Sequence, residues 1–478
     1  MNGRSASTNG RAAFRRTILL LLAAVALFFL YFFGLTRAGL IGPDEPRYAA
    51  IGRAMAATGD WITPRLWGAP WFEKPALLYW MTAAGFKLGL GNDLAPRLPV
   101  AMASVAFLIY FFFALRREFG DRAAWYSTAI LSTSAGWVAY SRVAITDLPM
   151  SAAFAAAMLV IRLAIRDEPR ATASRFLAAG ALLGLAVLAK GLVPLVLFIP
   201  ALWFLRRRFR DLALLFLAAL VIAAPWYSLV TLRNGTPFLQ DFLWNHHFGR
   251  FLNSTLQHQQ PVWFYVPVLL AGLFPWTPLV GLLPDTRLFR DRRAQFLLAW
   301  FLWGLVFFSA SRNKLPGYLL PLLPPAAALI GVALRGGAST EVKMTGATGS
   351  SVRARTLLAT CGALLCLAPA LAAMLPQALL AGLSRASFRL TLPWIAAGLA
   401  MAVSCALCDR AGRRDLAVGL ITLFSIVSVA AVVWDVYPEL DRQLSGRRVA
   451  PASCLPPTSR SQRYSIEYYA DHNLPDCK

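Results

Sequence analysis

The sequence predicts an all-α, polytopic membrane protein. Of its 478 residues, 58% are apolar and only 15% are charged, a composition typical of a chain that crosses a bilayer many times. Uncharged runs long enough for a membrane helix recur along the chain. The first covers residues 17–33 and continues without the small-residue site at which a signal peptide is cleaved. We therefore expect this run to remain as a span.

Further apolar runs bring the number of predicted membrane helices to about thirteen. The segment 174–205 can be one kinked span or two, and it is counted here as two. The further runs cover residues 98–115, 123–140, 148–165, 174–189, 191–205, 212–232, 262–283, 295–310, 316–334, 356–375, 390–408 and 416–434.

Arginine sets the predicted orientation. With the N-terminus in the cytoplasm, one set of short connections carries most of the arginines, which is the pattern of cytoplasmic loops. The net charge of +24 then reflects attraction to anionic lipid head groups, and we expect no binding to nucleic acid. The arginine-rich connections lie at residues 4–16, 116–122, 162–175, 206–210, 287–293 and 410–414.

This map predicts a membrane domain over residues 1–435 and a short periplasmic tail over residues 436–478. Two periplasmic loops, 35–96 and 233–261, are large enough to carry chemistry. The apolar runs contain Cys361, Cys366, Cys405 and Cys408, which we expect to be buried thiols. Cys454 and Cys477 fall in the tail, where an oxidising compartment favours a disulfide between them.

The first large loop is expected to hold two interfacial helices. In the first of them, Asp44 is the expected N-cap, Pro46 lies in the first turn and Gly59 ends the helix. Tyr48, Ile51 and Met55 share one face, which predicts an amphipathic helix at the membrane surface. The second helix is expected from Pro75 to about Leu88, too short to cross the bilayer.

Charged residues beside the outer ends of the spans are candidates for function. Charges in this position are unfavourable unless they pair or serve a substrate. Cations can hold a phosphate while a carboxylate orients or deprotonates an acceptor. The candidates are Asp44, Glu45, Glu73, Lys74, Asp147, Lys190, Lys314, His246, His247 and His258.

Each candidate also has a structural interpretation. Asp44 and Asp147 can cap helices, Glu73 beside Lys74 can be a surface ion pair, and Lys190 can extend to the interface. Glu73 and His258 can together bind a zinc or manganese ion. The histidines at 246 and 247 can equally be solvated loop residues.

Several motifs resemble one family in the same order along the chain. They include GPDEPRYAAIGRAM, with its Asp-Glu pair, and FEKP at residues 72–75. The sequence is similar to bacterial members of the protein O-mannosyltransferase-like superfamily of GT-C glycosyltransferases, and most like the lipid A aminoarabinose transferases. The matching segments are residues 42–55, 58–80, 95–99, 141–149, 184–194, 245–265 and 313–324.

The resemblance implies a GT-C fold with about thirteen membrane helices in a bacterial inner membrane. It implies an inverting enzyme that transfers a sugar from undecaprenyl phosphate to lipid A or another envelope acceptor. The family has a longer periplasmic C-terminal domain than this tail, which leaves other acceptors open.

The resemblance and the chemistry together give a set of expected roles. The catalytic candidates are Asp44, Asp147 and Glu45. The candidates for donor phosphate binding are Lys74, Lys190, Arg47, Lys314 and Tyr318, and those for a divalent metal are Glu73 and His258.

Two other functions remain open from the sequence. A transferase of hexose or hexosamine to protein hydroxyls or other envelope glycans fits the same features. A transporter or flippase would show repeats and charges near the bilayer midplane, whereas the charges here gather on one side. There is no Walker loop and no glycine-rich dinucleotide motif, so we expect no nucleotide cofactor.

Overall fold

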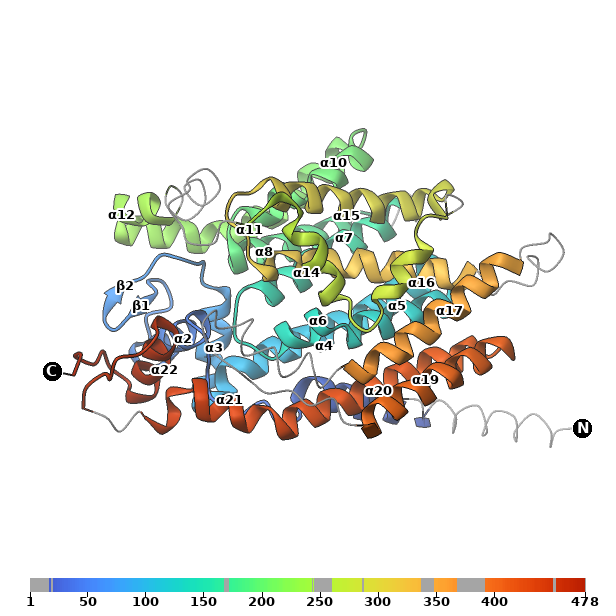
Figure 1. Ribbon diagram of the computed structural model, residues 1–478. Helices are drawn as coiled ribbons and strands as arrows, with labels where there is room; N and C mark the ends of the chain where they lie inside the picture. The colour runs from blue at the N-terminus through green and yellow to red at the C-terminus, as the bar shows by residue number, and fades with distance from the viewer. Residues whose placement is uncertain are drawn as a thin grey trace, which may run out of the picture.

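The computed structural model shows a bundle of long helices with a set of short elements gathered at one end (Figure 1). It describes most of the chain. The described residues are 17–18, 20–166, 172–242, 244, 260–285, 288–336, 348–367, 392–449 and 453–477.

Within these residues, eight helices are long and apolar enough to cross a membrane. The chain is therefore a multi-pass membrane protein, as predicted. These helices are α4 (Gly91–Phe119), α7 (Asp147–Arg166), α8 (Thr172–Lys190), α11 (Phe209–Asn234), α15 (Arg292–Ala310), η7 with α16 (Pro316–Leu322, Leu323–Gly336), α19 (Leu392–Arg410) and α20 (Arg414–Asp435).

Several other apolar runs form shorter or interrupted helices, so the count of about thirteen spans stays a prediction. Run 123–140 breaks at Ser134, whose backbone is extended. The shorter elements are η1 (Phe28–Phe32), α5 (Asp121–Thr133), α6 (Ala135–Ser141), α9 (Val193–Leu197), α10 (Ile199–Leu205), η4 (Val262–Phe264), α14 (Tyr265–Gly272), η5 (Thr277–Leu282), η6 (Leu288–Arg290), α17 (Thr348–Leu364) and η9 (Leu365–Leu367).

Three of the arginine-rich connections, at residues 116–122, 162–175 and 287–293, contact one another at one end of the bundle. The Arg166 and Arg335 guanidinium groups donate to the carbonyls of Arg117 and Phe119, and Arg414 donates to Leu334 O at 2.8 Å. These three connections, which the arginine pattern assigned to one side of the membrane, therefore do lie together, while residues 4–16 lie outside the described residues.

The opposite end carries the short elements, on the left in Figure 1. Most of them come from the two ends of the sequence, residues 44–87 and 437–470, and these two groups pack on one another through α2 and α22. These elements are α2 (Asp44–Thr58), β1 (Arg65–Leu66), β2 (Ala69–Pro70), α3 (Leu77–Lys87), α12 (Thr236–Leu239), α21 (Tyr437–Leu444), η10 (Gly446–Arg448) and α22 (Arg460–Ala470).

The first loop contains the two expected helices, with two differences. Helix α2 ends at Gly59 in the left-handed conformation, as predicted, but Pro43 occupies its N-cap and no side chain caps it. The prediction that Asp44 is the N-cap is therefore wrong. Tyr48, Ile51 and Met55 are buried, but protein rather than lipid covers this face, because α2 packs against α3 and α22.

A small β-hairpin between α2 and α3 was not foreseen from the sequence. Strands β1 and β2 are antiparallel, with Arg65 opposite Pro70. Trp67 and Gly68 have φ values of 50° and 82°, the positive angles that a two-residue type I′ turn requires. The aromatic content of this stretch obscured the turn, because only the glycine signals it.

Candidate active site

A cluster of four charged residues lies at the start of α2. We call it the Asp44 cluster; it consists of Asp44, Arg47, Glu73 and Lys74. Arg47 pairs with Asp44 through Nη2 and with Glu73 Oε2 through Nη1 at 3.1 Å. Lys74 Nζ lies 3.4 Å from Glu73 Oε1. The sequence placed these residues on one side of the membrane, and the fold brings them into contact.

Asp44 is the most exposed member of this cluster. Its side chain is 43% exposed, whereas those of Arg47 and Glu73 are 5% and 7% exposed. Burial disfavours the Arg47 charge, but the nearby carboxylates of Glu73 and Asp44 outweigh it and raise the pKa of Arg47 above its usual value. Arg47 is thus a permanent cation that holds two carboxylates in place, one of them open to a substrate.

Glu45 has a different environment from its neighbour Asp44. Its carboxylate is buried and accepts hydrogen bonds from Arg97 Nε at 2.7 Å and Arg97 Nη2 at 2.8 Å. The same two oxygens also accept from the backbone N–H groups of Ala144 and Ile41. The expectation that Glu45 takes part in catalysis conflicts with this geometry, because its oxygens are already engaged within the protein.

A second cluster, the Asp147 cluster, consists of Asp147, Lys190, Tyr318 and Tyr140. Asp147 begins α7 and Lys190 ends α8, so the two neighbouring helices bring these residues together. Lys190 Nζ lies 2.5 Å from Asp147 Oδ1 and 4.5 Å from the centre of the Tyr318 ring. The interpretation of Lys190 as a residue that only extends to the interface is therefore wrong.

Tyr140 lies beside Asp147 and was missed in the sequence. Its phenol lies within electrostatic reach of both Asp147 and Asp44. It belongs to α6, inside an apolar run where an aromatic residue gives no separate signal. Gly317 lies against the same group, because a Cβ atom there would be 2.6 Å from Asp147 Oδ1 and 2.7 Å from Tyr140 Cε1.

Lys314 is buried and faces backbone rather than either cluster. Its Nζ donates to Gln260 O at 3.1 Å and also to Ser311 O. Burial lowers the pKa of Lys314 below its usual value. The contacts favour a role in holding the chain at residue 260 over the expected role in phosphate binding.

The predicted metal site is only partly described. His246, His247 and His258 lie outside the described residues. Among the residues that are described, no three His, Cys, Asp or Glu side chains come together in a way that could hold a metal ion. Both Glu73 oxygens face cations, Arg47 and Lys74, so the described residues do not by themselves fit a metal. A zinc or manganese ion there stays a prediction.

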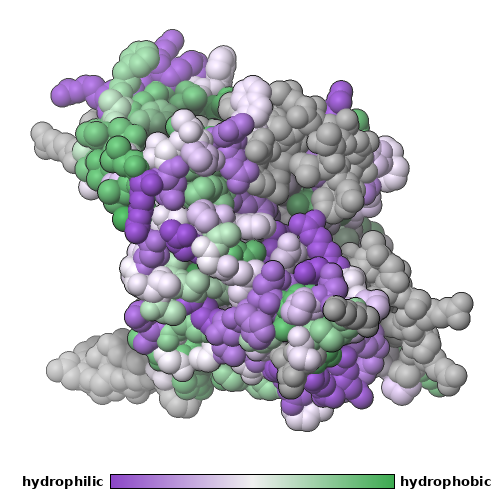
Figure 2. All heavy atoms as spheres, turned by 90° about the vertical axis from the view of Figure 1, so that its left-hand side faces the viewer, coloured by the Kyte–Doolittle hydropathy of each residue, from purple (hydrophilic) through white to green (hydrophobic). Residues whose placement is uncertain are grey.

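Polar side chains gather over this end of the molecule. Figure 2 looks onto the end that carries α2 and α22, and a hydrophilic area covers much of its centre and lower half. The Asp44 cluster therefore lies at a polar end, opposite the arginine-rich connections.

Comparisons with known proteins support the likeness seen in the motifs. Residues 73–229 match the dolichyl-phosphate-mannose-protein mannosyltransferase family. A Pseudomonas aeruginosa undecaprenyl phosphate-alpha-4-amino-4-deoxy-L-arabinose arabinosyl transferase is 35% identical over 337 residues, 67% of this chain and 60% of that protein. A second such transferase, from Pseudomonas fluorescens, is 33% identical over 362 residues, 72% of this chain and 59% of that protein.

A solved structure extends the likeness to nearly the whole chain. The crystal structure of ArnT from Cupriavidus metallidurans bound to undecaprenyl phosphate has a TM-score of 0.73 and 27% sequence identity, covering 96% of this chain and 85% of that one. The chain spans about 60% of the length of the curated relatives it matches. Fold, motifs and relatives agree that the chain belongs to the protein O-mannosyltransferase-like superfamily of GT-C membrane proteins.

Proposed function

We propose that the chain is an inverting glycosyltransferase that moves a sugar from undecaprenyl phosphate to an envelope acceptor such as lipid A. The observation that carries this proposal is the Asp44 cluster, in which one exposed carboxylate is held by a buried arginine beside Lys74. The names of the relatives and the undecaprenyl phosphate bound to ArnT support the choice of donor.

The two clusters supply the groups that this reaction needs. The acceptor oxygen forms a bond to the anomeric carbon of the sugar while the bond from that carbon to the phosphate oxygen breaks. Asp44 accepts the proton of an acceptor hydroxyl, or orients an acceptor that is itself a phosphate. Lys74 and Lys190 stabilise the negative charge that develops on the departing polyprenyl phosphate.

A direct assay tests the proposed function. Purified protein in lipid is incubated with undecaprenyl-phosphate aminoarabinose and lipid A, and the products are identified by mass spectrometry. Lipid A and envelope glycoproteins from cells with and without the gene are compared in parallel. Sugar found on glycoproteins but not on lipid A would show that protein, rather than lipid A, is the acceptor. The absence of transfer to any acceptor would overturn the proposal.

We further propose that the Asp44 cluster faces the periplasm of a bacterial inner membrane, with the N-terminus in the cytoplasm and the C-terminus in the periplasm. This orientation rests on the positive-inside rule, because the arginine-rich connections at residues 116–122, 162–175 and 287–293 lie at the opposite end. Single cysteines in place of Ala69 and Ala411, both exposed, test it. An impermeant thiol reagent added to spheroplasts is expected to label position 69 alone. Labelling of both, or of 411 alone, contradicts the orientation.

Gly317→Ala tests the contribution of the Asp147 cluster. The added methyl group would collide with Asp147 Oδ1 and Tyr140 Cε1, so Asp147 must move relative to Lys190. Misplacement of a reacting group by about 1 Å can lower a rate about 100-fold, and we expect a loss of about 10- to 100-fold in turnover. Gly419→Ala, where an added Cβ has open space, is the control. Equal turnover in both variants would remove Asp147 from the proposed site.

A further inference from the structure

The C-terminal tail packs directly on the segment that leads into α2. Gly39 N donates to Asp441 Oδ1 at 2.8 Å, and Leu40 N donates to the Tyr469 hydroxyl at 2.8 Å. Ser465 donates to Leu40 O at 2.6 Å. These contacts join parts of the chain more than 400 residues apart. The tail is thus part of the same structural unit as the Asp44 cluster.

Helix α22 also contacts the middle of α2 and the start of α4. Arg53 of α2 donates to Tyr468 O at 2.7 Å and pairs with Asp471 at 2.7 Å. The Tyr468 hydroxyl donates to Asn92 O at 2.7 Å. These contacts lie about one to two turns beyond Tyr464 on the same helix, so they fix the position of α22 along α2.

Tyr464 of α22 lies over the guanidinium group of Arg47. The distance from Arg47 Cζ to the ring centre is 5.0 Å, comparable to the 5.4 Å and 5.8 Å for Trp71 and Tyr48. Arg47 donates through Nε to Pro43 O and through its two Nη atoms to Glu73 and Asp44. Hydrogen bonds use the edge of a guanidinium plane, whereas aromatic rings cover its faces. The ring contacts therefore restrict rotation of the Arg47 guanidinium plane, whose edge donates to the Glu73 and Asp44 carboxylates.

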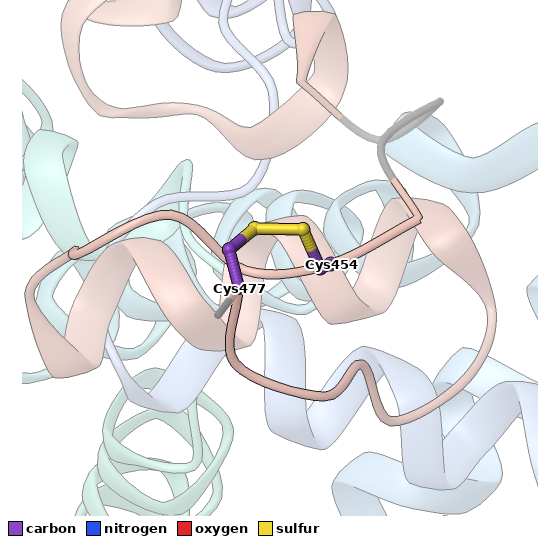
Figure 3. The surroundings of a disulfide bond; sticks show 2 residues. All are labelled: Cys454 and Cys477. Atoms are coloured by element: carbon purple, nitrogen blue, oxygen red, sulfur yellow. A yellow bond between two sulfur atoms is a disulfide. The ribbon is translucent and has the colours of Figure 1, made fainter.

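A disulfide closes the tail around α22. Cys454 is bonded to Cys477, as the sequence predicted (Figure 3), while the four cysteines in apolar runs are free. Next to this bond, Leu455 N donates to Pro475 O and Cys477 N donates to Leu455 O. Leu455, Ile466 and Leu474 form a small core beneath it. The bond thus joins both flanks of the helix that carries Tyr464.

We propose that Tyr464 is a positioning residue for the transfer reaction, and that the disulfide-closed tail holds its ring against Arg47 to fix the aim of Asp44 and Glu73. This proposal rests on the proposed function for its kinetic test only. The tail does not touch the substrate in this scheme. The tail acts through Arg47, whose orientation determines the position of the exposed Asp44 carboxylate.

The first test compares Tyr464→Leu with Tyr464→Phe. Loss of the ring is expected to lower kcat by about 10- to 100-fold with little change in the KM for the donor, and phenylalanine is expected to restore most of kcat. Tyr437→Leu is the control, because Tyr437 also lies against an arginine: Arg142 Cζ is 5.4 Å from its ring centre, and Arg142 Nε donates to its hydroxyl at 3.2 Å. Arg142 donates to the carbonyls of Leu30 and Phe33 rather than to the Asp44 cluster. Normal kcat in Tyr464→Leu, or an equal loss in the control, overturns the proposal.

The second test removes the disulfide with Cys454→Ser and Cys477→Ser together. Alone, this change is expected to lower kcat, because α22 loses its closure. Combined with Tyr464→Leu, it is expected to lower kcat little further, since both changes act through the same contact. Fully additive losses would show that the tail acts on the reaction by another route, which contradicts the proposal.

Hydrogen exchange separates this proposal from the proposed function. In Tyr464→Leu, the backbone amides of Arg47 and Tyr48, the first that α2 itself can protect, are expected to exchange faster than in the parent, while Tyr464→Phe and Tyr437→Leu match the parent. If the parent transfers no sugar, the proposed function fails, and the exchange rates still decide whether Tyr464 positions the start of α2. Unchanged exchange in the leucine variant overturns that role.

Discussion

Asp44→Asn is expected to lower sugar transfer by about 10²- to 10⁴-fold, the range that a general base contributes. The variant keeps the size of the side chain, but its amide cannot take up the proton of the acceptor hydroxyl. Its fold is expected to survive, because Pro43 rather than Asp44 occupies the N-cap of α2. Loss of one negative charge from the first turn of a helix changes stability by only about 0.3–1 kcal/mol.

The measurement compares kcat for transfer and the thermal unfolding of purified parent and variant. Asp60→Asn is the matched control, since Asp60 lies in the same loop and also pairs with arginine, at 2.8 Å from Arg233, but lies outside both clusters. Near-normal transfer in Asp44→Asn would contradict the assignment of Asp44 as the base. The assignment would then move to Asp147, whose carboxylate contacts Lys190.

The features that depend on local sequence were predicted well. Eight of the apolar runs formed helices long enough to cross a membrane, because in lipid a spanning segment must satisfy its backbone hydrogen bonds internally. Gly59 ended α2 because a left-handed residue is needed there. Three of the arginine-rich connections met at one end, and Cys454 paired with Cys477. Each of these outcomes follows from a few adjacent residues or from their side of the membrane.

The features that depend on distant partners were not predictable from the sequence. Asp44 and Glu45 are adjacent acidic residues, and nothing local shows that one is exposed while the other is buried against Arg97. Successive residues at the start of a helix point in different directions, so the surrounding chain decides their roles. The contact of Tyr464 with Arg47 joins residues from opposite ends of the chain. No periodicity or motif could indicate it.

The ion pair between Arg97 and Glu45 holds the chain just ahead of α2. Besides its two bonds to Glu45, Arg97 donates to Leu35 O at 2.7 Å and Gly39 O at 2.9 Å. The side chains of Arg97 and Glu45 are 4% and 0% exposed. Breaking such a buried pair from one side leaves an uncompensated charge, which costs about 3–5 kcal/mol.

Arg97→Met is therefore expected to lower the free energy of unfolding by about 3–5 kcal/mol, with the first loop losing its anchor. Adding Glu45→Leu to Arg97→Met is expected to restore part of this loss, because the buried charge is removed with its partner. Arg233→Ala is the control, since that arginine is 52% exposed in its pair with Asp60 and exposed pairs contribute about 0–1 kcal/mol. The measurement is unfolding of the purified proteins in matched detergent. A loss in Arg97→Met no larger than in Arg233→Ala would show that water reaches Glu45, and that the pair does not hold the Asp44 cluster in place.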